Sequence, residues 1–498
     1  MDGRRYEIAV IGGGIAGLAA AHALRGDPRL AVTVYEGSPR IGGKLHSSEL
    51  AGVRLDEGAE AMLARRPEGL DLAAAAGLGD RLVNPGTTSS GVWTRGALRP
   101  LPGGHVMGVP GDLEQLAASG VLSPEGSRRA AEDLTLPAAP VTTDVSVGEY
   151  VGARLGAEVT DRLVEPMLGG VYAGRAADLS LDATLPQIAG IARRGEPLLA
   201  GVRELRERTP DDPRPVFATV IGGGLGALPA AVAAASGARV RTGRTVRELR
   251  RTETGWRLVA GPAHDPEEVT ADAVIVAVPA RPAARLLAGV APAAAAELSR
   301  IDYASMAIVA LAFREGAFPE PPTGSGFLVP AVDGRTVKAV TFSSVKWPHL
   351  TRDAGGLMLV RCSIGRIGEE QVLQRPDEEL IAAAVADLGA ACGVRERPVD
   401  ARVTRWGGAL PQYTVGHLGR VARIREAVAA VPGLAVCGAA YSGVGVPACV
   451  ETAAQAAGRV RDHLAAAGQW KGAADSVRGQ SGYGAERLRG RAANGAER

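Results

Sequence analysis

The residue types best placed to bind a ligand form a glycine-rich turn near the start of the chain. An apolar run at 8–11 leads into this turn, and a helix-forming stretch and a second apolar run ending at Glu36 follow it. The turn consists of Gly12, Gly13, Gly14, Ile15, Ala16 and Gly17. Gly12 permits a tight turn, Gly14 lets the backbone approach a pyrophosphate, and Gly17 lets a helix pack close to a sheet. The helix N-terminus would bind the pyrophosphate, and Glu36 would accept hydrogen bonds from ribose hydroxyls. The pattern predicts a dinucleotide site; the alternative is a turn with a structural role alone.

The sequence after Glu36 indicates which dinucleotide is bound. Residues 36–44 include Gly37, Arg40, Gly43 and Lys44, and they resemble the E-x-x-x-R-x-G-G-K/R extension of FAD-binding amine oxidases, phytoene desaturases and porphyrinogen oxidases. The resemblance implies FAD as the cofactor, with Arg40 and Lys44 as cationic donors to phosphate or to the reduced flavin. Gly58, Ala59 and Glu60 fall where that superfamily passes its backbone along the flavin. The alternative for 36–44 is a solvated basic loop.

Length and composition limit the possible classes of protein. At 498 residues the chain exceeds one ordinary core, so two or three domains are expected. A net charge of +2 argues against nucleic-acid binding, and no apolar stretch is long enough to predict a membrane-spanning helix. The four cysteines form no C-x-x-C pair and no metal-ligand cluster is visible. With no signal peptide visible, we expect a reduced, cytoplasmic protein that holds no metal.

The apolar runs predict an α/β fold in which one domain is assembled from separate pieces of the chain. Short apolar runs at 239–241, 273–278 and 434–437 suit strands of a buried sheet, and a long helix is expected at about 448–466. A second glycine-rich run, residues 221–226, is not followed by an acid at the end of a strand. We therefore interpret that run as structural.

The spacing of apolar residues divides the rest of the chain into segments expected to be helical and segments expected to be strands. Helix-like spacing is expected at 112–118, 123–134, 146–155 and 160–168. Strand-like runs at 306–313, 336–342, 357–364 and 401–406 predict an antiparallel sheet that binds substrate. The predicted organisation is a Rossmann-like FAD-binding domain (1–60, 216–280 and 405–466), a substrate-binding domain (61–104 and 281–404), a helical subdomain (105–215) and a disordered tail (468–498).

Further segments resemble the oxygen-dependent protoporphyrinogen/coproporphyrinogen oxidase family over about residues 5–466. The most specific is the run 169–174, Gly-Gly-Val-Tyr-Ala-Gly, which amine oxidases and desaturases lack. Residues 105–110 resemble the Gram-positive branch, whose members oxidise coproporphyrinogen III; the arginine that eukaryotic members carry near Ser90 for a propionate is absent. The resemblance implies an amine-oxidase-like architecture. It extends the expected FAD contacts to Ala61, Val246, Trp406, Ala439, Val444, Gly445 and Val446.

The resemblance also implies a reaction. It is the FAD-dependent, six-electron oxidation of coproporphyrinogen III to coproporphyrin III in haem biosynthesis, in three two-electron steps, with dioxygen as acceptor and release of hydrogen peroxide. The cofactor carries the hard chemistry, and no histidine stands in a motif that nominates it as a base, so no catalytic residue is assigned. Hand-over of product to a ferrochelatase and peripheral membrane contact are further expectations.

A substrate with four carboxylates needs cations around a flat apolar slot. The candidate substrate contacts are Arg65, Arg66, Gly170, Val171, Leu328, Lys338 and Lys346. For each cation, a solvated surface position is the alternative. Alternative functions are a protoporphyrinogen IX oxidase, an FAD amine oxidase, a carotenoid desaturase, and a flavoprotein that has lost turnover. Aromatic residues are only 4% of the chain, which disfavours the aromatic cage of an amine oxidase.

Overall fold

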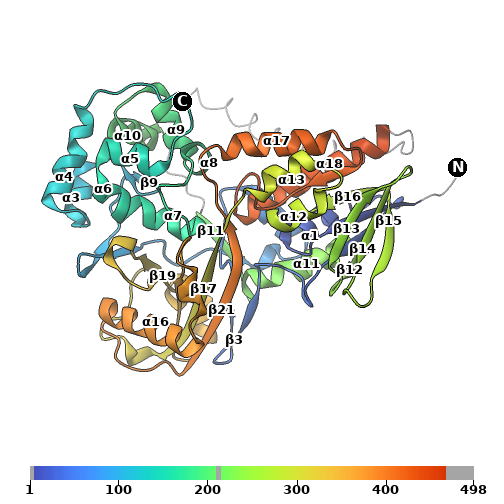
Figure 1. The fold of residues 1–498 in the computed structure, drawn as a ribbon. Coiled ribbons are helices and arrows are strands. Elements are labelled where there is room, and N and C mark those ends of the chain that lie inside the picture. The colour runs from blue at the N-terminus through green and yellow to red at the C-terminus, as the bar shows by residue number, and fades with distance from the viewer. Residues whose placement is uncertain (1–4, 209–214, 467–498) are drawn as a thin grey trace, which may run out of the picture.

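The structure, a computed structural model, describes residues 5–208 and 215–466, so the tail expected at 468–498 lies outside the described residues. Three layers of structure are visible in Figure 1: a group of helices from the first half of the chain, a large sheet beside α16 (Asp377–Cys392), and a further sheet region with α1 and α18 beside it. The α/β class expected from the sequence is confirmed.

A five-stranded parallel sheet forms the nucleotide-binding end of the molecule. Its order is β12 (Arg239–Arg241), β2 (Leu30–Tyr35), β1 (Tyr6–Ile11), β16 (Ala273–Val276) and β22 (Leu434–Val436). The strands come from three distant parts of the chain, as the apolar runs predicted. Successive residues of β1 face opposite sides, so Ile8 and Val10 join one core while Ala9 and Ile11 join the other.

Both faces of the parallel sheet are covered, as a parallel sheet requires. On one side pack α1 (Ile15–Ala23), α11 (Leu228–Ser236) and α18 (Val446–Ala466). On the other side pack β13 (Val246–Arg251), β14 (Trp256–Ala260), β15 (Glu267–Ala271), α12 (Ala280–Leu287), α13 (Pro292–Ser299) and α17 (His417–Ala429). The helix N-termini of α1 and α18 therefore meet at the carboxyl edge of the sheet.

A seven-stranded sheet builds the second layer. Its order is β21 (Asp400–Pro411), β17 (Tyr303–Arg314), β20 (Leu357–Ile364), β19 (Val337–Phe342), β18 (Gly326–Leu328), β7 (Gly91–Thr94) and β8 (Ala97–Pro100). Its pairs are antiparallel except for β18 with β7. The antiparallel sheet predicted from the strand-like runs is confirmed, and helix α16 covers one of its faces.

The helical subdomain contains most of residues 113–208. Its main helices are α3 (Leu113–Ser119), α4 (Pro124–Ala131), α5 (Val147–Leu155), α7 (Glu165–Tyr172), α8 (Leu181–Thr184), α9 (Pro186–Arg194) and α10 (Leu198–Arg208). The predicted helix starts are confirmed at Asp112, Ser123 and Ser146, because each side chain accepts hydrogen bonds from the first turn of its helix. A π-helical turn at Thr160–Val164 leads directly into α7.

The second glycine-rich run is structural, as predicted. The carboxylate of Asp56 accepts hydrogen bonds from the backbone N–H groups of Leu225 and Gly226, at 2.9 and 3.0 Å. A Cβ atom at Gly224 would lie 2.0 Å from an oxygen of Asp56. The protein's own carboxylate therefore fills the place that a phosphate would need.

The domain boundaries are a proposal. Two strands assigned wholly or partly to the FAD-binding domain lie outside its parallel sheet. Strand β21 continues to Pro411 inside the antiparallel sheet, although the sequence assigned 405–411 to the FAD-binding domain. Strand β11 (Phe217–Val220) pairs with β5 (Met62–Leu63) and β6 (Leu82–Val83) in a small separate sheet. Neither strand belongs to the five-stranded parallel sheet.

The close approach of α1 to the sheet gives a test of the fold. A Cβ at Gly17 would lie 1.9 Å from the carbonyl oxygen of Gly12, so Gly17→Ala must push the helix away from the strand. We expect a loss of stability at or above the roughly 1–3 kcal/mol typical of overpacking, measured by thermal unfolding. The control is Gly458→Ala in α18, where an added Cβ meets nothing within 4 Å. Equal melting temperatures for the two variants would contradict this packing.

Candidate functional site

One cavity of about 1070 Å³ connects the glycine turn to the face of the seven-stranded sheet. The turn between β1 and α1 lies at one end, and helix α7 and strands β17, β19 and β20 supply the other end. The volume exceeds the roughly 300–1,000 Å³ typical of a pocket for one drug-sized ligand. The cavity therefore has room for a ligand as large as a dinucleotide, and its far end is lined by a different set of elements.

Most of the residues predicted to bind the cofactor line this cavity. They are Gly12, Gly14, Ile15, Ala16, Glu36, Gly37, Gly43, Lys44, Gly58, Ala59, Ala61, Val246, Trp406, Ala439, Val444, Gly445 and Val446. The lining thus brings together three segments from the start, the middle and the end of the chain. Four predicted residues do not line the cavity but lie next to residues that do: Gly13, Gly17, Arg40 and Glu60.

Three of these four residues hold the lining in shape. The backbone N–H of Gly13 donates to Oε2 of Glu36 at 2.7 Å. Gly17 permits the helix contact described above. The guanidinium of Arg40 lies 5.8 Å from the ring centroid of Trp406, in a cation–π contact. Glu36 therefore shapes the glycine turn as well as facing the cavity.

The prediction that Glu60 contacts FAD needs correction, because its side chain points into a buried ion cluster. Its carboxylate accepts from the Ser343 hydroxyl at 2.8 Å and from Lys346 Nζ at 3.0 Å, and it lies 3.4 Å from Nη1 of Arg361. Burial alone would raise the pKa of Glu60, but Lys346 and Arg361 outweigh burial and lower that pKa to about 2. Its neighbours Ala59 and Ala61 line the cavity, but Glu60 does not.

The cavity suits an anionic dinucleotide. A Cβ at Gly14 would meet nothing within 4 Å, which leaves an open cradle at the N-terminus of α1. Burial lowers the pKa of Lys44, and its ammonium has no carboxylate or hydrogen-bond partner among the described residues. The lining has basic side chains at Lys44, Arg247, Arg285 and Arg361 and an acidic one at Glu36. A bound pyrophosphate would supply the anion that Lys44 lacks.

The other end of the cavity is a slot between α7 and the seven-stranded sheet. Gly170 and Val171 come from α7, while Met306, Ile308, Ala339, Thr341 and Ser363 come from the sheet. A bulge in the pairing of β17 with β21 lies between Ala304 and Met306, and it brings Met306 opposite Trp406. Bulges occur next to active sites because they redirect side chains.

Five of the predicted substrate contacts are not in the lining, and these predictions need correction. Arg66 pairs with Glu68 at 2.6 Å and with Glu451 at 2.8 Å, so its charge is used between α2 (Pro67–Ala75) and α18. Lys346 is held by Glu60. Arg65 borders no part of the cavity.

Leu328 and Lys338 lie behind the slot. Leu328 supports Gly170, whose added Cβ would be 3.7 Å from Cδ2 of the leucine. Lys338 borders a separate small cavity with Glu165 and Arg366. Burial, and then the neighbouring Arg366, lower the pKa of Lys338 to about 7.

The prediction missed Arg361, which is the basic side chain that the described structure places in the slot wall. Arg361 is 7% exposed, and its Nη2 donates to the carbonyl of Gly58 at 2.6 Å. Arg361 and Ser363 stand two apart on β20 and so share one face of the sheet. The alternation of side chains along β20 could be predicted from the sequence, but which face of the strand borders the cavity could not. Cys449 was also missed; burial raises the pKa of this thiol to about 11, which keeps it protonated.

Comparisons with known proteins agree with this site. The family model for flavin-containing amine oxidoreductases matches residues 15–461. The coproporphyrinogen III oxidase of Mycobacterium tuberculosis is 38% identical over 465 residues, covering 91% of this chain and 97% of the relative. That of Bacillus subtilis is 32% identical over 461 residues, covering 90% and 96%. A solved Exiguobacterium structure, named as a protoporphyrinogen oxidase, has a TM-score of 0.81 at 31% identity and covers 92% of this chain and 99% of its own.

The chain therefore belongs to the flavin-containing amine oxidoreductase family, and it is an FAD-dependent oxidoreductase. The family resemblance and the cofactor predicted from the sequence are confirmed. Within residues 5–208 and 215–466, no helix combines the length and apolar character needed to cross a bilayer.

A substitution at Gly14 can test FAD binding without disturbing the fold. The residue has φ −72° and ψ 173°, which valine tolerates, and its Cβ position is empty. We expect Gly14→Val to fold with a melting temperature near that of the wild-type apoprotein but to retain no FAD, because the valine fills the approach of the pyrophosphate. Absorbance of the purified protein near the flavin band measures the FAD content. A folded variant with full FAD content would show that the cradle is not the pyrophosphate site.

Proposed function

We propose that this protein oxidises coproporphyrinogen III to coproporphyrin III in haem biosynthesis. The observation that carries the proposal is one continuous cavity, in which the expected FAD-binding segments adjoin a slot between α7 and the seven-stranded sheet. The relatives named coproporphyrinogen III oxidase, matched over nine tenths of the chain, support the same substrate. We propose the division into FAD-binding, substrate-binding and helical regions on the same basis.

The protein's own part in the reaction is to bind, orient and enclose. When bound, FAD supplies the redox chemistry by accepting two electrons in each of three steps, and dioxygen removes them as hydrogen peroxide. Gly170 lets the macrocycle approach α7 closely because it has no side chain, and Val171, Met306 and Ile308 give the slot apolar walls. A slot walled in this way excludes water from the reacting C–H bond.

Charge in the slot favours a carboxylate-bearing substrate. Arg361 stands in the wall, and the carbonyl of Gly58 and the carboxylate of Glu60 fix its position. Its Nε has no hydrogen-bond partner among the described residues. A preorganised guanidinium of this kind suits a propionate, because less side-chain entropy is lost on binding.

The second candidate substrate is protoporphyrinogen IX, which has two carboxylates rather than four. The Exiguobacterium structure named as a protoporphyrinogen oxidase favours it. We further propose a cytoplasmic setting, dioxygen as acceptor, delivery of the product to a ferrochelatase and peripheral contact with a membrane. The four cysteines are all unpaired, which supports a reducing compartment.

Substrate preference tests the proposal. We expect a higher kcat/KM for coproporphyrinogen III than for protoporphyrinogen IX, measured by porphyrin fluorescence at matched detergent and oxygen. Arg361→Met should reduce the ratio of the two kcat/KM values by about tenfold, the effect of losing roughly 1.4 kcal/mol from one charge-assisted pair. The ratio is informative because both substrates use the same flavin.

The control for this experiment is Arg66→Met, which removes a cation outside the cavity. We expect it to leave the ratio unchanged, because Arg66 is committed to Glu68 and Glu451. A wild-type preference for protoporphyrinogen IX would refute the substrate assignment. If Arg66→Met changed the ratio as much as Arg361→Met, the assignment of the slot as the substrate site would be refuted.

A further inference from the structure

One tyrosine hydroxyl holds the loop that joins β22 to α18. This loop, residues 438–445, contributes Ala439 and Val444 to the cavity. The hydroxyl of Tyr413 donates to the carbonyl of Ala439 at 2.6 Å and accepts from the backbone N–H of Gly443 at 2.8 Å. A single side chain from outside the loop therefore connects its two ends.

The loop depends on such an external contact. Gly438 has φ +122° and Gly443 has φ +137°, so both ends adopt conformations that favour glycine and leave the chain permissive. Within the loop, the backbone hydrogen bond from Tyr441 to Gly438 is long, at 3.4 Å. Two other side chains from outside the loop contact it: the Thr452 hydroxyl accepts from the Gly438 N–H at 3.1 Å, and Arg425 donates to the Ser442 hydroxyl at 2.6 Å. The Tyr413 hydroxyl bonds two backbone groups of the loop, and both of its bonds are shorter than that of Tyr441 to Gly438.

Ring contacts hold Tyr413 itself in place, and one of them is to α7. It is 1% exposed, and its ring stacks on His417 at 3.8 Å and contacts Tyr172 at 5.5 Å between centroids. Tyr172 is the last residue of α7, the helix that carries Gly170 and Val171. The side-chain amide of Gln412 also donates to the carbonyl of Tyr172 at 2.8 Å.

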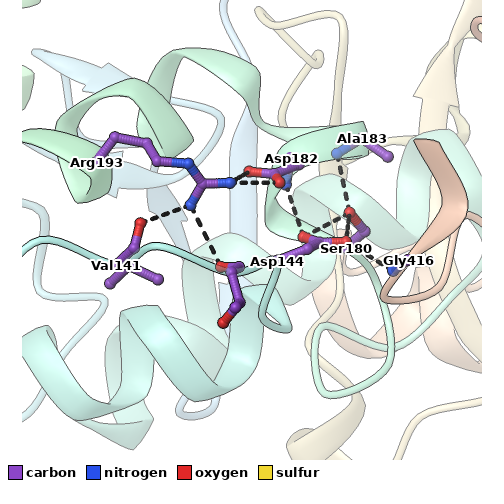
Figure 2. Close-up of polar contacts among 8 residues, drawn as sticks. Val141, Asp144, Ser180, Asp182, Ala183, Arg193 and Gly416 are labelled. Carbon is purple, nitrogen blue, oxygen red and sulfur yellow. Dashed lines mark hydrogen bonds and ion pairs between the residues drawn. The ribbon is translucent and has the colours of Figure 1, made fainter. Parts of the chain in front are cut away.

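The turn after Tyr413 is anchored to the helical subdomain. Figure 2 shows Asp144 between Ser180 and Gly416; it accepts from the Ser180 hydroxyl at 2.7 Å and from the Gly416 N–H at 2.7 Å. Arg193 extends the same network by pairing with Asp182 at 2.6 Å. The tyrosine is therefore held on both sides of the turn, while its hydroxyl reaches the loop.

We propose that Tyr413 is a positioning residue for the flavin: its hydroxyl sets residues 438–445 so that the N-terminus of α18 faces the cavity. A helix N-terminus carries partial positive charge, which stabilises negative charge on the reduced cofactor. The contact with Tyr172 links the same loop to α7, and this second part of the inference rests on the proposed function of the slot.

The test is Tyr413→Phe, which keeps the ring contacts and removes the hydroxyl. We expect the Kd for FAD, measured by titration of the apoprotein, to rise about tenfold, and the midpoint potential of the bound flavin to become more negative. A tenfold greater loss of affinity for reduced than for oxidised FAD corresponds to about 30 mV. With substrate, kcat should fall more than KM changes, because the slot residues are untouched.

The matched control is Tyr441→Phe in the same loop. The Tyr441 hydroxyl is buried and has no hydrogen-bond partner among the described residues, so we expect its removal to leave the Kd and the potential unchanged. Equal losses in both variants, or no loss in Tyr413→Phe, would overturn the proposal. If coproporphyrinogen is not oxidised by the wild type, the proposed function fails while the FAD readouts still decide the role of Tyr413.

Hydrogen exchange of the wild-type holoenzyme gives a readout that does not depend on the folding of any variant. The amide of Gly443 should exchange as slowly as those in the middle of α18, because its acceptor is the buried Tyr413 hydroxyl. Fast exchange at Gly443 beside slow exchange in α18 would show that the bond does not hold the loop, and the proposal would fail.

Discussion

Residues 57–61 pass between the nucleotide-binding turn and the seven-stranded sheet, and this passage sets how the two ends of the cavity face each other. A Cβ at Gly58 would lie 1.8 Å from the carbonyl oxygen of Lys44, so only glycine permits the approach. On the other side, Arg361 donates to the carbonyl of Gly58, and the indole N–H of Trp406 donates to the carbonyl of Glu57 at 2.8 Å. Backbone contacts from both layers thus fix one short segment beside the flavin site.

The buried charges near this segment are arranged to keep it there. Glu60 holds Lys346 and Arg361 together, and removing one partner of such a cluster leaves an uncompensated buried charge. The pKa of Glu60 lies at about 2 in the folded protein, below its usual value of 4.5. Its stabilising contribution is therefore present above about pH 4.5 and is lost as the pH falls towards 2. At neutral pH the Glu60 carboxylate therefore stays charged and holds Arg361 in the slot wall.

The local parts of the site were predictable because they depend on short-range rules. The glycines of the first turn, the acid at the end of β2, and the N-caps Asp112 and Ser123 follow from backbone geometry and spacing alone. The strands of the antiparallel sheet were also predicted, because their apolar runs are long and bounded by turns.

The cations of the slot were not predictable in the same way. Lys338 and Arg361 lie on the neighbouring strands β19 and β20, and Lys346 lies on the short helix α14 (Ser343–Lys346) that follows β19. The sequence gives no reason to prefer any of the three. The pairing of β19 with β20 shifts register between Val337 and Ala339, and such a shift changes which residues share a face. Only the folded register places Arg361 at the cavity, Lys338 behind α7 and Lys346 against Glu60.

The most direct measurement of the central claim is an anaerobic titration of the FAD-loaded protein with coproporphyrinogen III, following flavin absorbance. If the slot presents the macrocycle to the flavin, the substrate alone should bleach the flavin. Because the full oxidation releases six electrons and each flavin accepts two, the end point should lie at about one third of an equivalent of substrate per flavin. A flavin that stays oxidised with excess coproporphyrinogen III, yet is bleached by dithionite, would contradict the account.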